Sequence, residues 1–184
     1  WAEDTAGIGD TGYMLAGPVI RMKAEIVSVS SSEDVRITRI ADAGNNGWGF
    51  AHELGHIFNF AGGDWYYTTY GNLEGWPNLF SIYTLEKFGL DMHKNASSCP
   101  ERKRMYINSG QYNEKNLGDA WTALCFLLEL KDNHGDWETY KKFYDEFNRN
   151  PGYGWRFFRD RMNAASGEDT TATFNSWRIP FEND

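Results

Sequence analysis

The segment HELGH at residues 52–56 sets the strictest condition on the fold of this chain. Apolar residues recur around it at helical spacing, and two glycines follow, so we predict a helix over residues 48–61. The recurring apolar residues are Phe50, Leu54, Ile57 and Ala61. His52 and His56 stand four residues apart, on the side of the helix opposite to these apolar residues. One face of the helix is therefore expected in the core, while the other presents two imidazoles.

Two imidazoles one helical turn apart can bind the same zinc ion. Catalytic zinc takes three protein ligands and keeps one position for water, and a neighbouring carboxylate can remove a proton from that water. Glu53, between the two histidines, has the residue type and the position for this general base. We therefore predict one Zn²⁺ ion bound through His52 and His56 in a hydrolytic site. Gly55, on the histidine side, leaves room for a close neighbour.

The third zinc ligand has to come from further along the chain. A histidine in the longer pattern HExxHxxGxxH is excluded, because Asn59 and Gly62 occupy its last two fixed positions. The best candidate is Glu74, at the start of a second predicted helix, from which a carboxylate can return to the metal. Asp64 and Glu86 are the alternatives.

The rest of the sequence separates into an extended part and a helical part. Residues 1–45 are rich in glycine, serine and β-branched residues, with candidate strands at 19–22, 24–29 and 35–40. From residue 46 onward, helical patterns dominate. The helices after the first are predicted at about 75–87, at 119–131 with Asp119 as the N-cap, from Asp136 to a turn at 150–152, and near 155–164 and 170–177.

The predicted fold class is therefore α+β and mainly helical. A small β-rich N-terminal part over residues 1–45 joins a helical C-terminal part over 46–184 that carries the metal site. We expect a single catalytic domain over residues 1–184, which is monomeric and excised from a larger multidomain protein.

Composition excludes several other classes of protein. Hydrophobic residues make up 41% and aromatic residues 16%, too much for a disordered chain. The 18 basic and 26 acidic residues leave a net charge of −8, so we expect no nucleic-acid partner. The longest mainly apolar run, residues 120–130, is shorter than the ~20 residues that cross a membrane, so no membrane insertion is expected. Cys99, in a polar loop, and Cys125, in an apolar helix, can form one disulfide, but we favour two free thiols.

Several segments together resemble the enhancin-like metallopeptidases, family sixty of the metallopeptidases. They are GWGF at 47–50, HELGH, the stretch from Glu74 to Ser81, the helical residues around 137–143, and the closing residues 166–180. Arg178 and the threonines at 170–171 depart from the family pattern outside the metal site. The resemblance implies a zincin-like catalytic domain of the gluzincin type, with His52, His56 and Glu74 as zinc ligands and Glu53 as general base.

The resemblance also implies a substrate and a location. Family members act on O-glycosylated, mucin-like glycoproteins, as secreted or cell-surface enzymes that often carry carbohydrate-binding modules beside the catalytic domain. We therefore interpret the chain as an extracellular zinc-dependent endopeptidase that hydrolyses peptide bonds in such glycoproteins through a zinc-activated water, with Glu53 as the base. Two alternatives are a zinc peptidase for unglycosylated protein and a non-catalytic glycan-binding scaffold.

Further residues are expected around the metal. Asn78, four residues after Glu74, can orient a ligand side chain, and Asn59 can line the cleft. The aromatic residues Trp65, Tyr66 and Tyr67 fall between the metal helix and Glu74, and flat aromatic faces suit sugar rings, although ordinary packing is the alternative.

A donor that stabilises the transition state is not identified by its spacing. The candidates are Tyr66, Tyr67, Tyr70 and His134.

Overall fold

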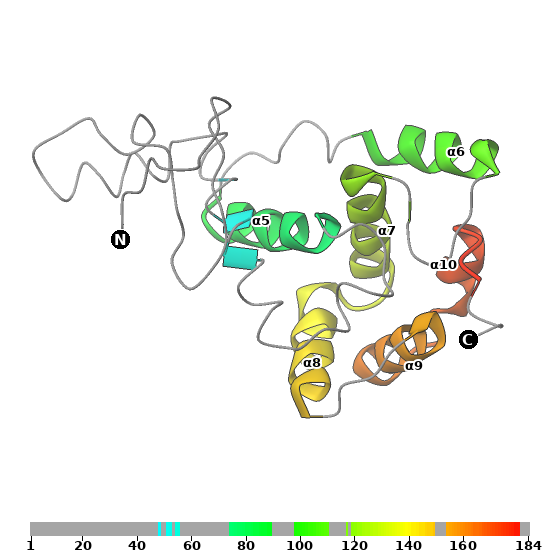
Figure 1. Cartoon of the computed structure of the whole chain (residues 1–184). Coiled ribbons are helices and arrows are strands. Elements are labelled where there is room, and N and C mark those ends of the chain that lie inside the picture. Colours follow the sequence, from blue (N-terminus) through cyan, green and yellow to red (C-terminus); the bar gives the residue numbers. More distant parts are fainter. Residues whose placement is uncertain are drawn as a thin grey trace, which may run out of the picture. The chain divides into compact units, whose positions relative to one another are not determined.

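The computed structural model describes residues 48, 51–52, 54–55, 74–89, 98–110, 117, 119–149 and 154–180 (Figure 1). Of these residues, 82% are helical and none lies in a strand. The predicted α+β class is therefore wrong, and the part of the chain that the structure describes is mainly helical. Short β-branched runs are weak evidence for strands, because their preference depends on the partners they pack against. The β-rich part predicted over 1–45, with its three strands, lies outside the described residues.

Helices make up most of the part of the chain that the structure describes (Figure 1). They are α5 (Gly75–Lys87), α6 (Cys99–Ser109), α7 (Ala120–Asn133), α8 (Asp136–Arg149), α9 (Gly154–Ser166) and α10 (Thr171–Ser176). All but α6 were predicted near these bounds. The first predicted helix, 48–61, is helical at each of its described positions, which are 48, 51–52 and 54–55.

The chain divides into two compact units, one of Trp1–Phe58 with Pro77–His93 and one of Asn59–Trp76 with Lys94–Asp184. Helix α5 begins in the second unit and continues in the first. The single catalytic domain over 1–184 remains a prediction. No helix in the described ranges is long and apolar enough to span a membrane.

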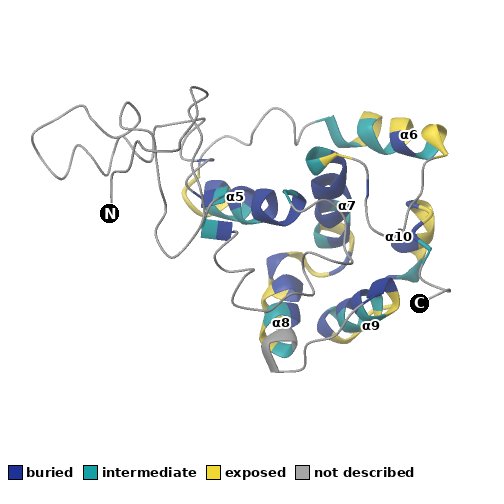
Figure 2. Ribbon diagram, in the orientation of Figure 1, coloured by how far each residue is buried: buried dark blue, intermediate teal, exposed yellow. Residues whose placement is uncertain are grey.

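The second unit has an aromatic core. Phe158, which is fully buried, lies 5.4 Å from Trp76, 5.6 Å from Phe174 and 6.3 Å from Phe126 between ring centroids. Steep angles between the ring planes, from 61° to 71°, place ring edges against ring faces, which is a favoured arrangement of aromatic pairs. Much of α7 and α9, which carry Phe126 and Phe158, is buried (Figure 2).

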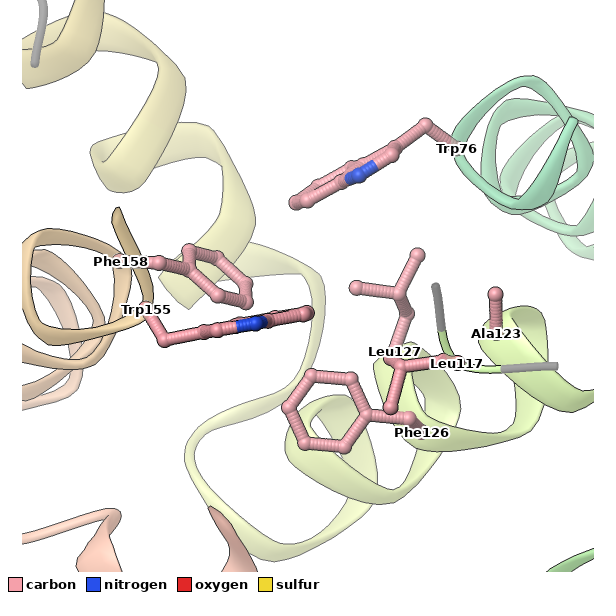
Figure 3. Close-up of a pocket in the computed structure, with 7 residues that line it drawn as sticks. All are labelled: Trp76, Leu117, Ala123, Phe126, Leu127, Trp155 and Phe158. Atoms are coloured by element: carbon pink, nitrogen blue, oxygen red, sulfur yellow. The ribbon is translucent and has the colours of Figure 1, made fainter. Parts of the chain in front are cut away.

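A small apolar cavity remains inside this core (Figure 3). Its volume is about 10 Å³, and the residues that line it are Trp76, Leu117, Ala123, Phe126, Leu127, Trp155 and Phe158. A space of this size holds about one water at most, and its walls offer little to hydrogen-bond one. The cavity is therefore a packing defect and not a substrate site.

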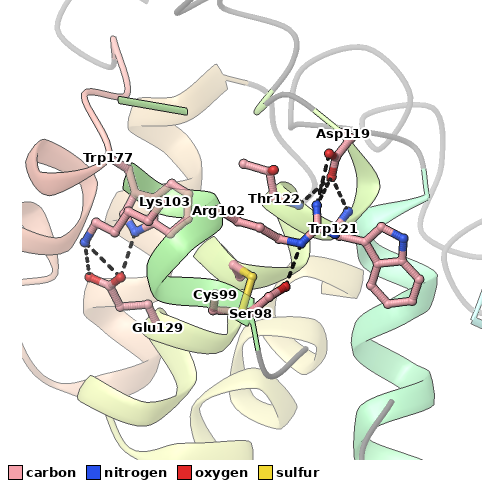
Figure 4. Close-up of a disulfide and its surroundings, with 10 residues drawn as sticks. Ser98, Cys99, Arg102, Lys103, Asp119, Trp121, Thr122, Glu129 and Trp177 are labelled. Carbon is pink, nitrogen blue, oxygen red and sulfur yellow. Dashed lines mark hydrogen bonds and ion pairs between the residues drawn. A yellow bond between two sulfur atoms is a disulfide. The ribbon is translucent and has the colours of Figure 1, made fainter. Parts of the chain in front are cut away.

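Helix α7 begins at the predicted cap. The Asp119 carboxylate accepts hydrogen bonds from the backbone N–H groups of Trp121 and Thr122, at 2.9 and 2.8 Å (Figure 4). It thus satisfies amides that the first turn of a helix leaves without partners. Arg102 of α6 donates to both oxygens of the same carboxylate, at 3.2 and 3.1 Å. The predicted N-cap is confirmed.

Helix α6 was not predicted, and the disulfide at its start was only the less favoured alternative. Cys99 forms a disulfide with Cys125, so the predicted free thiols are wrong, and Cys99 is the first residue of a helix and not a loop residue (Figure 4). Pro100 in the first turn and Gly110 after the last, with φ of 65°, were the available signals for this helix. These end signals did not suffice to predict the helix, because it has a polar composition, and Tyr106 is its only buried residue.

Candidate metal centre

The first unit brings the predicted zinc ligand His52 against the start of α5. The Nδ1 atom of His52 lies 2.8 Å from the side-chain oxygen of Asn78, which is 3% exposed. An amide oxygen can only accept, so the assignment puts the proton on Nδ1, and the lone pair of the ring lies on Nε2. This is the tautomer that a metal ligand bonded through Nε2 requires. The donor chemistry of His52 therefore fits a zinc ligand.

Two more contacts hold the same pair of segments together. The Ser81 hydroxyl donates to the backbone carbonyl of Trp48 over 3.0 Å. A Cβ atom added to Gly55 would lie 2.8 Å from Cα of Pro77, which is closer than real Cβ atoms approach. The close neighbour expected at Gly55 is thus the first turn of α5. The role of Ser81 was not predicted, and its signal was its position three residues after Asn78 on one helix face.

Glu74, the best candidate for the third ligand, is a half-buried turn residue directly before α5. It belongs to the second unit, together with Gly75 and Trp76. A Cβ atom added to Gly75 would lie 2.7 Å from that of Ala123, so α5 begins in close contact with α7. Trp76 then packs its ring against Phe143 and Phe158, with centroids 6.2 and 5.4 Å away. The backbone next to Glu74 is therefore firmly anchored.

The other predicted site residues lie outside the described residues. These are Glu53, His56, Asn59, Asp64, Trp65, Tyr66, Tyr67 and Tyr70. Glu86, an alternative third ligand, is exposed on the last turn of α5. Within the described ranges, no three His, Cys, Asp or Glu side chains lie together as a metal site. The predicted site includes His56, so its complete ligand set stays a prediction.

His134, a candidate transition-state donor, is hydrogen-bonded within the second unit through both ring nitrogens. It is 9% exposed in the turn between α7 and α8, where Nδ1 lies 3.1 Å from the Glu168 carboxylate and Nε2 lies 2.9 Å from the Thr173 hydroxyl. Nε2 thus joins this turn to Thr173 of α10, and Nδ1 joins it to Glu168, which precedes that helix. These contacts favour a role in packing the second unit.

Comparison with known families decides the class of the protein. Residues 10–175 match the family model described as peptidase M60, enhancin and enhancin-like. The chain belongs to this family. The match covers the histidine segment, Glu74 and α5 through most of α10. No curated protein matches the sequence.

Membership makes this enhancin-like chain a metallopeptidase, which hydrolyses peptide bonds. The family is generally zinc-dependent and commonly extracellular. The resemblance found in the sequence is thereby confirmed at the level of the family.

Proposed function

We propose that this enhancin-like chain is a zinc-dependent endopeptidase that cleaves O-glycosylated, mucin-like glycoproteins outside the cell. The observation that carries the zinc part of the proposal is the hydrogen bond from His52 Nδ1 to Asn78, at 2.8 Å. It supports a neutral imidazole with its proton on Nδ1, which is the tautomer in which Nε2 is the metal-binding atom.

The proposed ligands of the one zinc ion are His52, His56 and Glu74. When bound there, zinc supplies a Lewis acid that makes water more acidic and a peptide carbonyl more electrophilic. Two neutral imidazoles and one carboxylate are the ligand types of hydrolytic zinc enzymes, with a position left for water. Asn78 keeps the His52 ring in one tautomer and one orientation.

Glu53 is the proposed general base. Its carboxylate takes a proton from the attacking water as the new C–O bond forms, and it returns that proton to the amine as the peptide C–N bond breaks. Glu53 ends the cycle as it began, so the net reaction consumes one water and one peptide bond. Glu53 directly follows His52 in the sequence, and the His52 imidazole is held by its contact with Asn78.

The proposed location agrees with the disulfide between Cys99 and Cys125. Structural disulfides persist in oxidising compartments and are rare in the cytosol. The family supports the glycoprotein substrate, and Trp65, Tyr66 and Tyr67 offer the residue types that pack on sugar rings. We further propose a monomer, with carbohydrate-binding modules beside this domain in the full-length protein and with no nucleic-acid partner.

Digestion of a mucin-type glycoprotein tests the proposal. The wild-type chain and Glu53→Ala are incubated with the glycoprotein before and after enzymatic removal of its O-glycans, and cleavage sites are read by mass spectrometry. Cuts beside glycosylated Ser or Thr that vanish in the variant and on deglycosylation are the expected result. Cuts that survive deglycosylation would indicate a peptidase for unglycosylated protein. A glycoprotein that is bound but never cut would indicate a glycan-binding scaffold.

A further inference from the structure

Three contacts join the helical segment around His52 to the start of α5. The pairs are Trp48 with Ser81, His52 with Asn78, and Gly55 with Pro77. Residue numbers rise along one segment while they fall along the other, so the two segments are antiparallel where they touch. The spacing of 48, 52 and 55 places these positions on one face of a helix. The contact is thus a seam between two helix faces, with the His52–Asn78 pair in its middle.

Ser81 bridges the two backbones at one end of this seam. Its hydroxyl oxygen lies 3.0 Å from the carbonyl oxygen of Trp48 and 3.4 Å from that of Pro77, and the residue is 0% exposed. A serine inside a helix usually bonds the carbonyl four residues before it, which here is Pro77. The single hydroxyl proton instead favours the shorter contact to Trp48, 33 residues away in sequence.

The carbonyl of Trp48 has a direct relation to His52. In a regular α-helix the carbonyl of one residue accepts the amide four residues later, and Trp48 precedes His52 by four. The Ser81 hydroxyl therefore bonds a carbonyl at the helical position four residues before the zinc-ligand candidate.

Gly55 sets the closest approach at the other end of the seam. An added Cβ atom would lie 2.8 Å from Cα and 3.1 Å from the carbonyl oxygen of Pro77, and 3.2 Å from Cβ of Phe80. Two of these three atoms are backbone, which cannot swing aside as the end of a side chain can. Any larger residue at position 55 therefore has to push the two segments apart.

We propose that Ser81 and Gly55 are positioning residues of the zinc site, which set the spacing and the register at which His52 meets Asn78. Neither touches the metal or the substrate; both act through the His52 imidazole. The hydrogen bond of 2.8 Å is lost beyond about 3.5 Å, so a shift of less than an ångström between the segments releases the ring. This inference rests on the proposed function, because it requires His52 to bind zinc.

Zinc affinity of the whole chain tests the inference without relying on activity. The apo proteins are titrated with Zn²⁺ in competition with a chromophoric chelator, and the Co²⁺ forms are compared by their visible absorption spectra. Ser81→Ala is expected to weaken zinc binding by ~10-fold and to change the Co²⁺ spectrum, as loss of outer contacts to metal ligands commonly does. Gly55→Ala is expected to change both readouts in the same direction, and it carries the test if Ser81→Ala does not fold.

Thr84→Val is the matched control. The Thr84 hydroxyl donates a hydrogen bond of 2.8 Å to the carbonyl of Phe80, four residues before it on the same helix. Its loss thus removes a half-buried hydroxyl whose acceptor lies on α5 itself, and it leaves the Ser81, Asn78 and Pro77 side chains unchanged. Thermal unfolding of the apo proteins measures the purely structural cost, which we expect to be similar for Ser81→Ala and Thr84→Val. Zinc affinity is expected to fall for Ser81→Ala and to stay unchanged for Thr84→Val.

The outcomes distinguish a failure of the proposed function from a failure of the positioning role. A wild-type chain that binds no zinc overturns the proposed function. A wild-type chain that binds zinc, with Ser81→Ala or Gly55→Ala folded and equally tight, overturns the positioning role alone. An equal loss of affinity in Thr84→Val and Ser81→Ala also overturns it, because any loss of a hydroxyl from α5 would then act alike.

Discussion

The indole N–H of Trp177 donates a hydrogen bond of 2.9 Å to the Glu129 carboxylate, which joins the end of α10 to α7 (Figure 4). The same carboxylate accepts from the Lys103 ammonium of α6, at 2.7 and 2.9 Å. Lys103 also lies over the Trp177 ring, 5.2 Å from its centroid. A single glutamate thus connects three helices of the second unit, and Trp177 is 1% exposed there.

Removal of this carboxylate should destabilise the second unit. Glu129→Ala leaves the buried Trp177 N–H without its acceptor, which costs about 1–3 kcal/mol of unfolding free energy. Urea unfolding followed by tryptophan fluorescence measures the change. Glu101→Ala is the control, because Glu101 pairs with Arg104 on the surface of α6 and such pairs add little. Equal stability of the two variants would show that the connection through Glu129 is unimportant.

The disulfide should contribute strongly to stability. Cys99 and Cys125 are 26 residues apart, and closing a loop of that length restricts the unfolded chain by about 3.5 kcal/mol in the chain-entropy model. Cys99→Ala, Cys125→Ala and the double variant should each lose about this amount, because one bond is lost in all three cases. Urea unfolding with and without reductant measures the loss. Two free thiols in the denatured, unreduced protein would contradict the prediction.

Alkaline pH should weaken the contribution of Tyr140 to the stability of the folded protein. Burial raises the pKa of this phenol well above its usual value of 10.0, and its O–H donates 2.8 Å to the carbonyl of Leu127. The native state then keeps a proton that the unfolded chain releases above pH ~10, so stability falls by about 1.4 kcal/mol per pH unit from this residue.

Tyr140→Phe isolates the effect. At pH 8 the variant should be less stable than wild type by about 1 kcal/mol, since it lacks the hydrogen bond. Above pH 10 the difference should shrink and then reverse, because the variant has no proton to lose at this position. Urea unfolding at several pH values from 8 to 11 provides the measurement. A difference that stays constant over this range would argue against a buried phenol.

Zinc content should distinguish the candidate third ligands. Glu74→Ala is expected to lose zinc on dialysis, whereas Glu86→Ala, which alters an exposed side chain on the last turn of α5, should keep one ion. The metal is quantified by atomic emission after dialysis against a weak chelator. Retention by Glu74→Ala with loss from Glu86→Ala would reverse the assignment.

Helices with clear local end signals were predictable from the sequence. Asp119 caps α7 through its own side chain, and Gly89, with φ of 67°, follows the end of α5. Helix α6 lacked an apolar stripe, and its place depends on partners that are distant in sequence, such as Trp177, whose ring centroid lies 5.9 Å from that of Tyr106. Local patterns do not contain such contacts, and for the same reason they do not decide between free thiols and the disulfide.

The candidate site was predictable in its residue types more than in its contacts. The helical spacing placed Asn78 one turn after Glu74, but the sequence could not say which side chain it would meet. The partner, His52, lies 26 residues before it, and the seam that joins them depends on Ser81 and Gly55. Local motifs therefore indicate the residue types of the site, whereas the contacts that hold a metal-ligand side chain in place depend on tertiary packing.

The bond between Cys99 and Cys125 also affects how damage to this protein is detected. A single backbone cut anywhere between the two cysteines leaves both fragments covalently joined. Such a nicked chain migrates as one species of full mass on a non-reducing gel and separates only after reduction. Self-digestion of the enzyme within this loop would therefore pass unseen unless preparations are checked under reducing conditions.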